Sequence, residues 1–263
     1  MSYQNLKYLD GVASVIITTY NDSRFIKDCI KSLVEKTSIP LEIIVCDNST
    51  IPETRDNIRK YAEQSAEKAY DLKIIHSRNQ TSIGHVNNYG MQVSRGQYLF
   101  YANDDIKMIT ENWCERMIDS ANKHIDGGVF GIVGTSTYYK QTVSDKYQPD
   151  NYKGKVEVSA TVAGILIHIP RNVIDKLGLW DENLSNYCWL DVDWSIRVRA
   201  AGLKPYFCKD VFALHLRRAT AEMKAEQQKL WCDKYGVDKI KTESDLIRAV
   251  ARAKEVYGYS SIA

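Results

Sequence analysis

Short apolar runs alternate with amphipathic stretches over the first hundred residues. The runs cover residues 12–19, 41–46, 72–76 and 97–102, and they are rich in β-branched side chains. Each run predicts a buried strand. In the stretch that follows the first run, apolar residues recur at intervals of three and four, which predicts a helix. The resulting β-α-β-α-β-α-β order predicts an α/β fold, with a mostly parallel central sheet covered by helices on both faces.

The second half of the chain has a less regular pattern. Helices are expected at 112–123 and from the end of the 189–193 segment through Arg199, and strand-like runs occupy 127–135, 156–169 and 205–214. From residue 220 onward the chain is charged, favours helix and contains no proline. This last part predicts a helical tail on or beside the main domain.

Polar side chains follow three of the predicted strands at the point where each strand ends. They occupy residues 18–21, 47–49 and 103–105. The carboxyl ends of parallel strands share one edge of a sheet, so these groups predict a nucleotide site there. The adjacent acids Asp104 and Asp105 repel each other unless a cation lies near them, and a divalent cation with oxygen ligands is the usual partner. A solvated turn is the alternative, because Asn and Asp are common turn residues.

Composition and charge exclude several classes of protein. The 263 residues carry a net charge of +2, which is too balanced to indicate a nucleic-acid partner. Six cysteines are scattered without a C-x-x-C pair, as expected of a reduced protein. The longest apolar stretches are too short to span a bilayer. These features predict a cytoplasmic protein and leave peripheral membrane association open. The chain also lacks the glycine-rich fingerprints of Rossmann and P-loop nucleotide sites.

The order of motifs resembles family 2 glycosyltransferases of the GT-A fold. The resemblance rests on residues 15–21, 44–49, 98–105, 178–182 and 190–193, and it extends over about residues 12–218. It implies a GT-A domain at 1–218, with a nucleotide-binding half at 1–105 and an acceptor-binding half at 106–218. The nucleotide-binding half would be Rossmann-like, and residues 219–263 would form a C-terminal helical extension.

The reaction implied by this resemblance is an inverting glycosyl transfer. The donor would be a nucleotide-diphosphate sugar, UDP-linked by preference, with dTDP and GDP open. The acceptor would be a hydroxyl of a glycan, a lipid-linked sugar or a protein. A fixed Mn²⁺ or Mg²⁺ would stabilise the departing diphosphate.

The resemblance also implies roles for individual residues. Asp191 would be the general base, although it also suits a helix N-cap. Asp105 would bind the metal, and His215 is a second ligand or a structural histidine. The donor-binding residues would be Thr18, Tyr20, Asp47, Asn79 and Asp104, with Asp47 also suited to an Asx turn.

Two positions depart from the family pattern, and several neighbouring residues keep two interpretations. Asn103 stands where some relatives have an acid, and Leu190 stands where the family has Glu. Asp193 and Arg197 are spaced for an intrahelical ion pair. Lys73 or Arg78 would offer a cation near the nucleotide, and Arg217 and Arg218 would close on the diphosphate or begin a helix. Trp180, Tyr187 and Trp189 would either offer flat apolar faces to a sugar ring or pack in the core. Core packing is favoured for Trp180.

Two other functions compete with glycosyl transfer. A sugar-nucleotide nucleotidyltransferase shares a related core, but it needs a glycine-rich, basic loop after the first strand, where this chain has Thr19-Tyr20-Asn21-Asp22. A non-catalytic binding module would account for the departures at Asn103 and Leu190.

Overall fold

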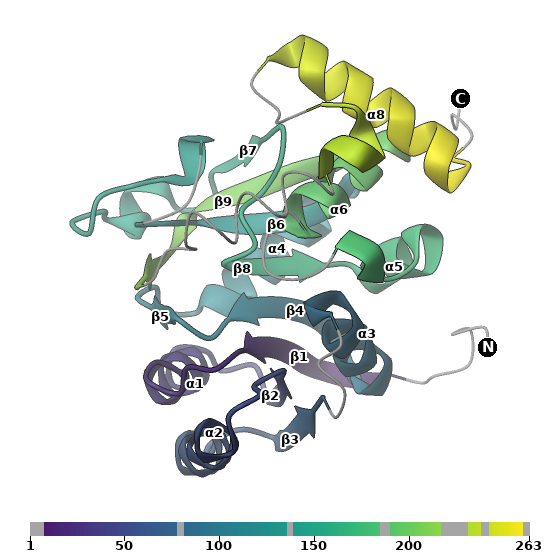
Figure 1. The fold of residues 1–263 in the computed structure, drawn as a ribbon. Coiled ribbons are helices and arrows are strands. Elements are labelled where there is room, and N and C mark those ends of the chain that lie inside the picture. The colour runs from purple at the N-terminus through teal and green to yellow at the C-terminus, as the bar shows by residue number, and fades with distance from the viewer. Residues whose placement is uncertain are drawn as a thin grey trace.

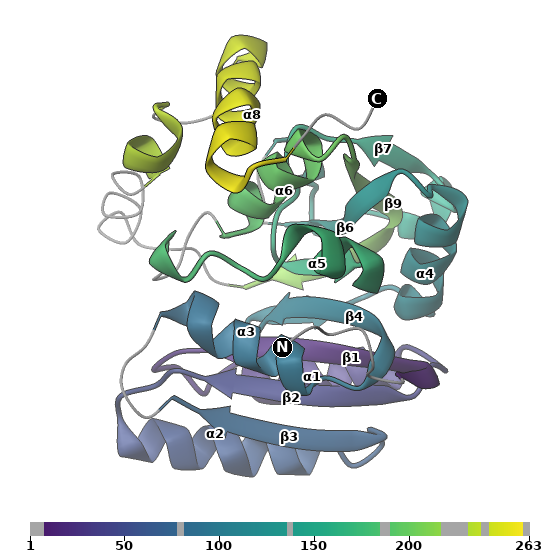
Figure 2. The same ribbon diagram turned by 90° about the vertical axis from the view of Figure 1, so that its right-hand side faces the viewer.

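A computed structural model of the chain describes residues 8–77, 82–135, 139–184, 190–216, 231–237 and 242–259. A central sheet with helices on both faces forms the body of the molecule (Figures 1 and 2). Along the sheet the strand order is β3-β2-β1-β4-β8-β6-β9-β5, and β7 pairs with β9. The strands are β1 (Leu9–Thr19), β2 (Leu41–Asp47), β3 (Asp71–His76), β4 (Gly96–Asn103), β5 (Ile106–Met108), β6 (Gly127–Gly134), β7 (Val156–Val158), β8 (Leu166–Ile169) and β9 (Lys204–His215).

The parallel ladders place the polar strand ends side by side, as predicted. Thr18 on β1 lies opposite Asn103 on β4, and Thr19 lies opposite Asp47 on β2. Asp47 in turn lies opposite His76, the last residue of β3. The long ladders of β1, β2, β3 and β4 are all parallel, so the four carboxyl ends meet at one edge of the sheet.

The expectation of one strand over residues 156–169 is wrong. The segment forms β7, which pairs with β9, and then β8, which is antiparallel to both β4 and β6. The intervening residues 159–165 leave the strand because their backbone amides bond to other elements: Val162 donates to the Ser195 hydroxyl and Gly164 to the Asp191 carboxylate. The three-residue strand β5 was not foreseen; it pairs with the end of β9. Even so, the longer ladders, including β6 with β9, are parallel.

Two apolar cores cover the two faces of the sheet. Alternate residues of β1 supply them: Val15 packs in the core that contains Leu33 of α1, and Ile16 packs in the core that contains Trp194 of α6. This alternation is the expected consequence of side chains pointing to opposite faces along a strand. The helices are α1 (Ile26–Glu35), α2 (Pro52–Ser65), α3 (Ile83–Val93), α4 (Trp113–Lys123), α5 (Arg171–Leu177), α6 (Leu190–Ala200) and α8 (Glu243–Tyr257), with short 3₁₀ turns at Tyr139–Gln141, Pro149–Tyr152 and Glu182–Leu184.

A C-terminal helix is present, as expected, and it lies beside α6 at the top of the view in Figure 1. Ala249 and Ala253 of α8 are fully buried in a third apolar cluster, which also contains Val192 of α6 and Trp231. A capping box between Thr242 and Asp245 begins α8. Among the helices of the described ranges, none has the length and apolar character needed to cross a bilayer.

Candidate active site

Asp47 lies at the centre of the first group of polar strand ends. Its side chain is fully buried, and its Oδ1 accepts a hydrogen bond from the backbone amide of Ser49 at 2.8 Å. This i to i+2 bond is the expected Asx turn. The other oxygen, Oδ2, lies 2.8 Å from Nδ1 of His76 on the neighbouring strand. The strand-end carboxylate is therefore held in one orientation by two partners.

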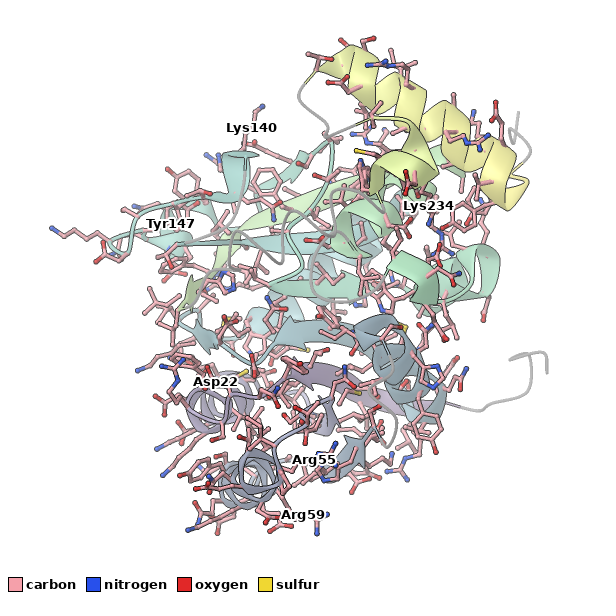
Figure 3. All side chains as sticks on the ribbon, viewed as in Figure 1. Asp22, Arg55, Arg59, Lys140, Tyr147 and Lys234 are labelled. Carbon is pink, nitrogen blue, oxygen red and sulfur yellow. The ribbon has the colours of Figure 1, made fainter. Side chains whose placement is uncertain are left out.

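The loops that follow β1 and β2 are tied together. Asn21 adopts a left-handed backbone with φ of 49°, and its Oδ1 accepts from the amide of Thr50 at 2.7 Å. The Asn21 amide donates to the Ser49 hydroxyl at 2.8 Å. Arg55 of α2, labelled in Figure 3, donates to the carbonyls of Ser49 and Ser77, which extends the connection to the end of β3. Tyr20 is half-buried in this loop region.

Thr18 of β1, Asn87 of α3 and Tyr101 of β4 belong to one polar cluster. The Thr18 hydroxyl donates to Oδ1 of Asn87 on α3 at 2.5 Å, and both side chains are buried. Tyr101 of β4 lies in the same cluster, and its hydroxyl donates to Oδ1 of Asn103 at 3.4 Å. Burial raises the pKa of Tyr101, and the negative charges of Asp191 and Asp104 raise it further. The Tyr101 hydroxyl therefore stays protonated in the field of those two acids.

Asp104 and Asp105 are both buried at the end of β4, each with 4% of its surface exposed. His215, the last residue of β9, is brought to them by the pairing of β9 with β5, in which His215 lies opposite Ile106. Its Nε2 is 3.2 Å from Oδ1 of Asp105 and 3.5 Å from Nδ2 of Asn103. The backbone amide of Leu216 also donates to the Asp105 carbonyl at 2.9 Å. The two residues proposed as metal ligands thus lie next to each other.

The first turn of α6 carries Asp191 toward this group. Its Oδ2 accepts from the Gly164 amide at 2.7 Å, and its Oδ1 accepts from the Val192 amide at 2.8 Å. The next residue of the loop, Ile165, accepts a hydrogen bond from the Asn103 amide at 3.0 Å. Two consecutive loop residues therefore connect Asp191 to the end of β4. The sequence distance between these two acidic positions is large, but the fold brings them to one site.

The donor set at Asp105 and His215 fits a divalent ion. Two neighbouring ligands of an octahedral ion, each about 2.1 Å from it, lie about 3 Å apart. The separation of 3.2 Å between the Asp105 oxygen and the His215 nitrogen matches this spacing. In the described ranges no three His, Cys, Asp or Glu side chains gather in an arrangement that could hold a metal. Two protein ligands would leave most of the coordination shell to the oxygens of a diphosphate and to water.

One expected cation lies elsewhere, and several candidate residues are outside the described ranges. Lys73 donates to Glu42 and to the carbonyl of Val93. Glu42 is the second residue of β2, five residues before Asp47, so the Lys73 ammonium group that bonds to it lies about 16 Å from the Asp47 end of the strand. Trp180 is 3% exposed and packs against Trp194, as its core interpretation predicted. The predictions outside the described residues concern Arg78, Asn79, Tyr187, Trp189, Arg217 and Arg218.

Four residues of the site were not identified from the sequence. His76 orients Asp47, Asn87 accepts from Thr18, Tyr101 lies between the acids, and Gly164 holds Asp191. The parallel register carries a signal for His76, because it ends the strand beside Asp47. The contact of Gly164 with Asp191 has no comparable local signal.

Comparisons with known proteins agree on one family. The profile of Glycosyl transferase family 2 matches residues 14–173. The putative glycosyltransferase EpsH of Bacillus subtilis is 28% identical over 113 residues, which cover 43% of this chain and 31% of that protein. The glycosyltransferase AglE of Haloferax volcanii is 25% identical over 224 residues, covering 81% of this chain and 70% of its own. This chain thus spans about a third of EpsH and a little over two thirds of AglE.

A solved structure extends the likeness to the fold. The mannosyltransferase PcManGT of Pyrobaculum calidifontis, in complex with GDP-mannose and Mn²⁺, superposes with a TM-score of 0.64 at 14% identity. The superposition covers 95% of this chain and 76% of that one. The predicted GT-A fold is confirmed. With the family profile covering more than half of its residues, this chain belongs to glycosyl transferase family 2.

Proposed function

We propose that the protein transfers a sugar, with inversion at the anomeric carbon, from a nucleotide-diphosphate sugar to an acceptor hydroxyl. The observation that supports this most is the connection of Asp191 to the Asn103–Asp105 strand end through Gly164 and Ile165. An inverting transfer needs one carboxylate for the proton of the acceptor oxygen, which attacks from the face opposite the leaving diphosphate, and a separate group for the diphosphate. Two acidic positions that lie in one site but on different elements suit this division of roles.

The donor is assigned to the strand ends of residues 1–105. Thr18, Tyr20 and Asp47 would line the base and the ribose, Asp104 would accept from a ribose hydroxyl, and Asn79 is assigned to the same side by the family pattern. Asp105 and His215 would hold Mn²⁺ or Mg²⁺. The ion, when bound, supplies positive charge to the diphosphate as its bond to the sugar breaks. PcManGT was solved with Mn²⁺, which supports the choice of metal class.

Asp191 is assigned the proton transfer. The acceptor oxygen attacks the anomeric carbon, the bond between that carbon and the diphosphate oxygen breaks, and the nucleoside diphosphate leaves with the electron pair. The acceptor proton passes to the Asp191 carboxylate. The amides of Gly164 and Val192 already donate to this carboxylate, so they hold it in one orientation before the acceptor arrives.

The acceptor is assigned to residues 106–218, and it is a glycan, a lipid-linked sugar or a protein. UDP is the preferred nucleotide from the family pattern, while the GDP-mannose complex of PcManGT favours a test of GDP beside it. The cytoplasmic location and the boundaries of the two halves stay predictions.

A thermal-shift screen with product detection tests this function. UDP, GDP and dTDP and their sugars are each added with and without Mn²⁺, and release of the nucleoside diphosphate is measured in parallel. Binding stabilises the folded state by mass action, so a ligand at 100 times its Kd raises the free energy of unfolding by about 2.7 kcal/mol. We expect one nucleotide series to raise the Tm only with metal, and its sugar to be slowly hydrolysed. Pyrophosphate release from a nucleoside triphosphate and a sugar phosphate, or no response to any nucleotide, would contradict the proposal.

A further inference from the structure

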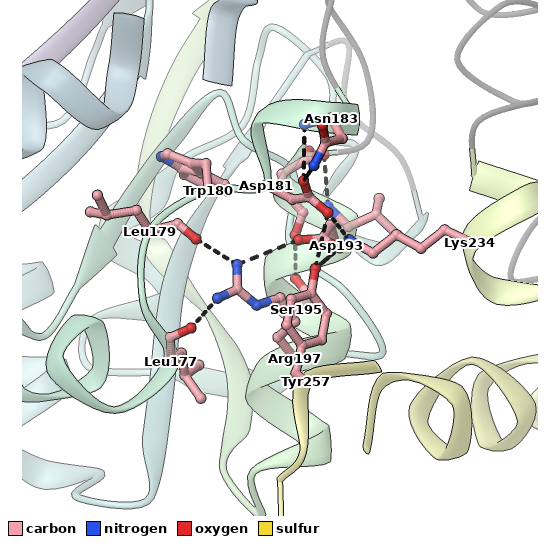
Figure 4. A network of polar contacts seen from close by, with 12 residues as sticks. Leu177, Leu179, Trp180, Asp181, Asn183, Asp193, Ser195, Arg197, Lys234 and Tyr257 are labelled. Atoms are coloured by element: carbon pink, nitrogen blue, oxygen red, sulfur yellow. Dashed lines mark hydrogen bonds and ion pairs between the residues drawn. The ribbon is translucent and has the colours of Figure 1, made fainter. Parts of the chain in front are cut away.

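The C-terminal segment, here residues 231–237 and 242–259, holds the helix that carries Asp191. Lys234 lies in the short helical stretch at residues 231–235, and its Nζ is 2.6 Å from Oδ2 of Asp181 and 2.6 Å from Oδ1 of Asp193. Figure 4 shows Lys234 reaching from the C-terminal segment to both carboxylates. The Lys234 side chain is 11% exposed and that of Asp193 is fully buried. One ammonium group thus joins three segments of the chain.

Two tyrosines from the same segment complete the contact. The hydroxyls of Tyr235 and Tyr257 both donate to Oδ1 of Asp193, the latter at 3.3 Å. Burial raises the pKa of Tyr235, and the charge of Asp193 raises it further, so this hydroxyl stays a donor. Burial alone would raise the pKa of Asp181, but the hydrogen bonds from Lys234 and Asn183 outweigh it and lower that pKa. Asp181 therefore faces Lys234 in its charged form.

Arg197 ties the middle of α6 to the loop before it. Its Nη1 donates to the Leu179 carbonyl at 2.7 Å and lies 3.6 Å from Oδ2 of Asp193, which confirms the expected ion pair. Its Nη2 donates to the Leu177 carbonyl, and its Nε donates to the Tyr259 hydroxyl at 3.2 Å. The guanidinium also stacks over the ring of Tyr257 at 4.6 Å. Charge is balanced here, with two carboxylates and two cations in contact.

The two anchors of α6 lie on opposite sides of its first turn. Residues two apart on a helix are rotated by about 200°, so Asp191 and Asp193 point away from each other. On the side of Asp191, the loop at 162–164 holds the helix through Gly164 and through Ser195, whose hydroxyl accepts from the Val162 amide at 3.1 Å. On the other side, the contacts come from the C-terminal segment. The first turn is therefore clamped between the site and the tail.

From this geometry we infer that Lys234 and Tyr235 are positioning residues for Asp191, so that these two residues of the C-terminal segment affect the catalytic rate through the position of α6. The inference rests on the proposed role of Asp191 as base. Loss of Lys234 leaves Asp181 and Asp193 facing each other without their shared cation. The repulsion shifts the first turn of α6, and with it the Asp191 carboxylate, away from the Gly164 amide.

The test compares Lys234→Met with wild type in the full chain. We expect kcat to fall at least tenfold while the KM for the donor and the donor-induced thermal shift change less than twofold, because the strand-end site is untouched. Lys254→Met, an exposed lysine on α8 of the same segment, is the matched control and should behave as wild type. Lys234→Arg, which keeps the charge, should recover most of kcat. Donor-binding stoichiometry gives the folded fraction, so loss of folded protein is separated from loss of rate.

Hydrogen exchange supplies a measurement that does not depend on turnover. The Gly164 amide is protected by its bond to Asp191, so its exchange in a peptide covering 162–166 reports the position of the carboxylate. We expect Lys234→Met and the milder Tyr235→Phe to raise this exchange, toward that of Asp191→Ala. Unchanged Gly164 exchange in both variants, or equal losses of kcat and donor binding, would overturn the inference. A wild type that transfers no sugar would instead contradict the proposed function, while the exchange comparison would still decide whether Lys234 positions Asp191.

Discussion

Gly164→Ala tests how closely the rate depends on the position of Asp191. A β-carbon on residue 164 would lie 3.0 Å from Cβ of Asp191 and 3.3 Å from its Cγ and Oδ2. Ordinary contacts begin at 3.4 Å, so the Asp191 side chain must move by a few tenths of an ångström. A misplacement of about 1 Å costs about 100-fold in rate, so we expect kcat to fall by roughly tenfold. The three atoms nearest to the added β-carbon all belong to Asp191 and none to the strand-end residues, so the KM for the donor should stay within twofold.

The assay is a double-mutant cycle on release of nucleoside diphosphate in the presence of acceptor. If Gly164→Ala acts by moving the base, it should cost nothing further when combined with Asp191→Asn, because the affected group is already inactive. Overpacking here should lower the free energy of unfolding by about 1–2 kcal/mol, which a thermal melt measures separately. A wild-type kcat in Gly164→Ala, or the same tenfold loss in the Asp191→Asn background, would refute the reasoning.

Three further predictions concern stability and the metal. Burial lowers the pKa of His168 from 6.5 to about 4, so as the pH falls the unfolded chain takes up the proton before the folded protein does. The free energy of unfolding should therefore fall by up to about 3 kcal/mol between pH 6.5 and pH 4. In denaturant melts of His168→Gln this pH dependence should vanish. Hydrogen bonds from Arg95, Lys73 and Ser14 outweigh burial and lower the pKa of Glu42 to about 2. The free energy of unfolding should therefore fall again as the pH is lowered from 4.5 toward 2. In the same melts, Glu42→Gln should lower the free energy of unfolding by about 2 kcal/mol at pH 7. Asp105→Ala and His215→Ala should each abolish the part of the nucleotide-induced Tm shift that requires Mn²⁺, and retention of it in both would contradict the metal assignment.

The part of the candidate site at the carboxyl ends of the strands could be predicted because its determinants are local. Each strand is a short apolar run, and Thr18, Asp47 and Asn103 follow the runs directly. Parallel pairing then places these ends side by side without further information. The bond from Ser49 to Asp47 was likewise predictable, since an Asx turn involves residues two apart.

The contacts that orient the proposed catalytic groups depend on long-range packing, which leaves little trace in local patterns. His215 reaches Asp105 through a pairing of only three residues, Ile106–Met108 with the end of β9. The resemblance to the family suggested the contact between His215 and Asp105, but no hydrophobic periodicity in the sequence predicts it. Residues 156–169 appear as one apolar strand, yet the Gly164 amide turns toward Asp191 instead of joining a ladder.

The contacts of Lys234, in the C-terminal segment, could not be predicted from local sequence patterns either. In the sequence it is one charged residue among many in a segment that favours helix, where exposed lysines are the ordinary case. Its burial depends on two acids, Asp181 and Asp193, that are more than forty residues earlier in the chain. The ion pair of Asp193 with Arg197 was predictable from their spacing of four, whereas the contact with the tail was not.

The central claim, that Asp191 removes the acceptor proton while the end of β4 holds the donor, is tested most directly by Asp191→Asn. The substitution keeps the shape of the side chain and removes its ability to accept the proton at neutral pH. With the donor found in the screen and saturating Mn²⁺, we predict that kcat falls by 10²–10⁴-fold while the Kd of the donor changes less than threefold. Turnover at the wild-type rate would contradict the account.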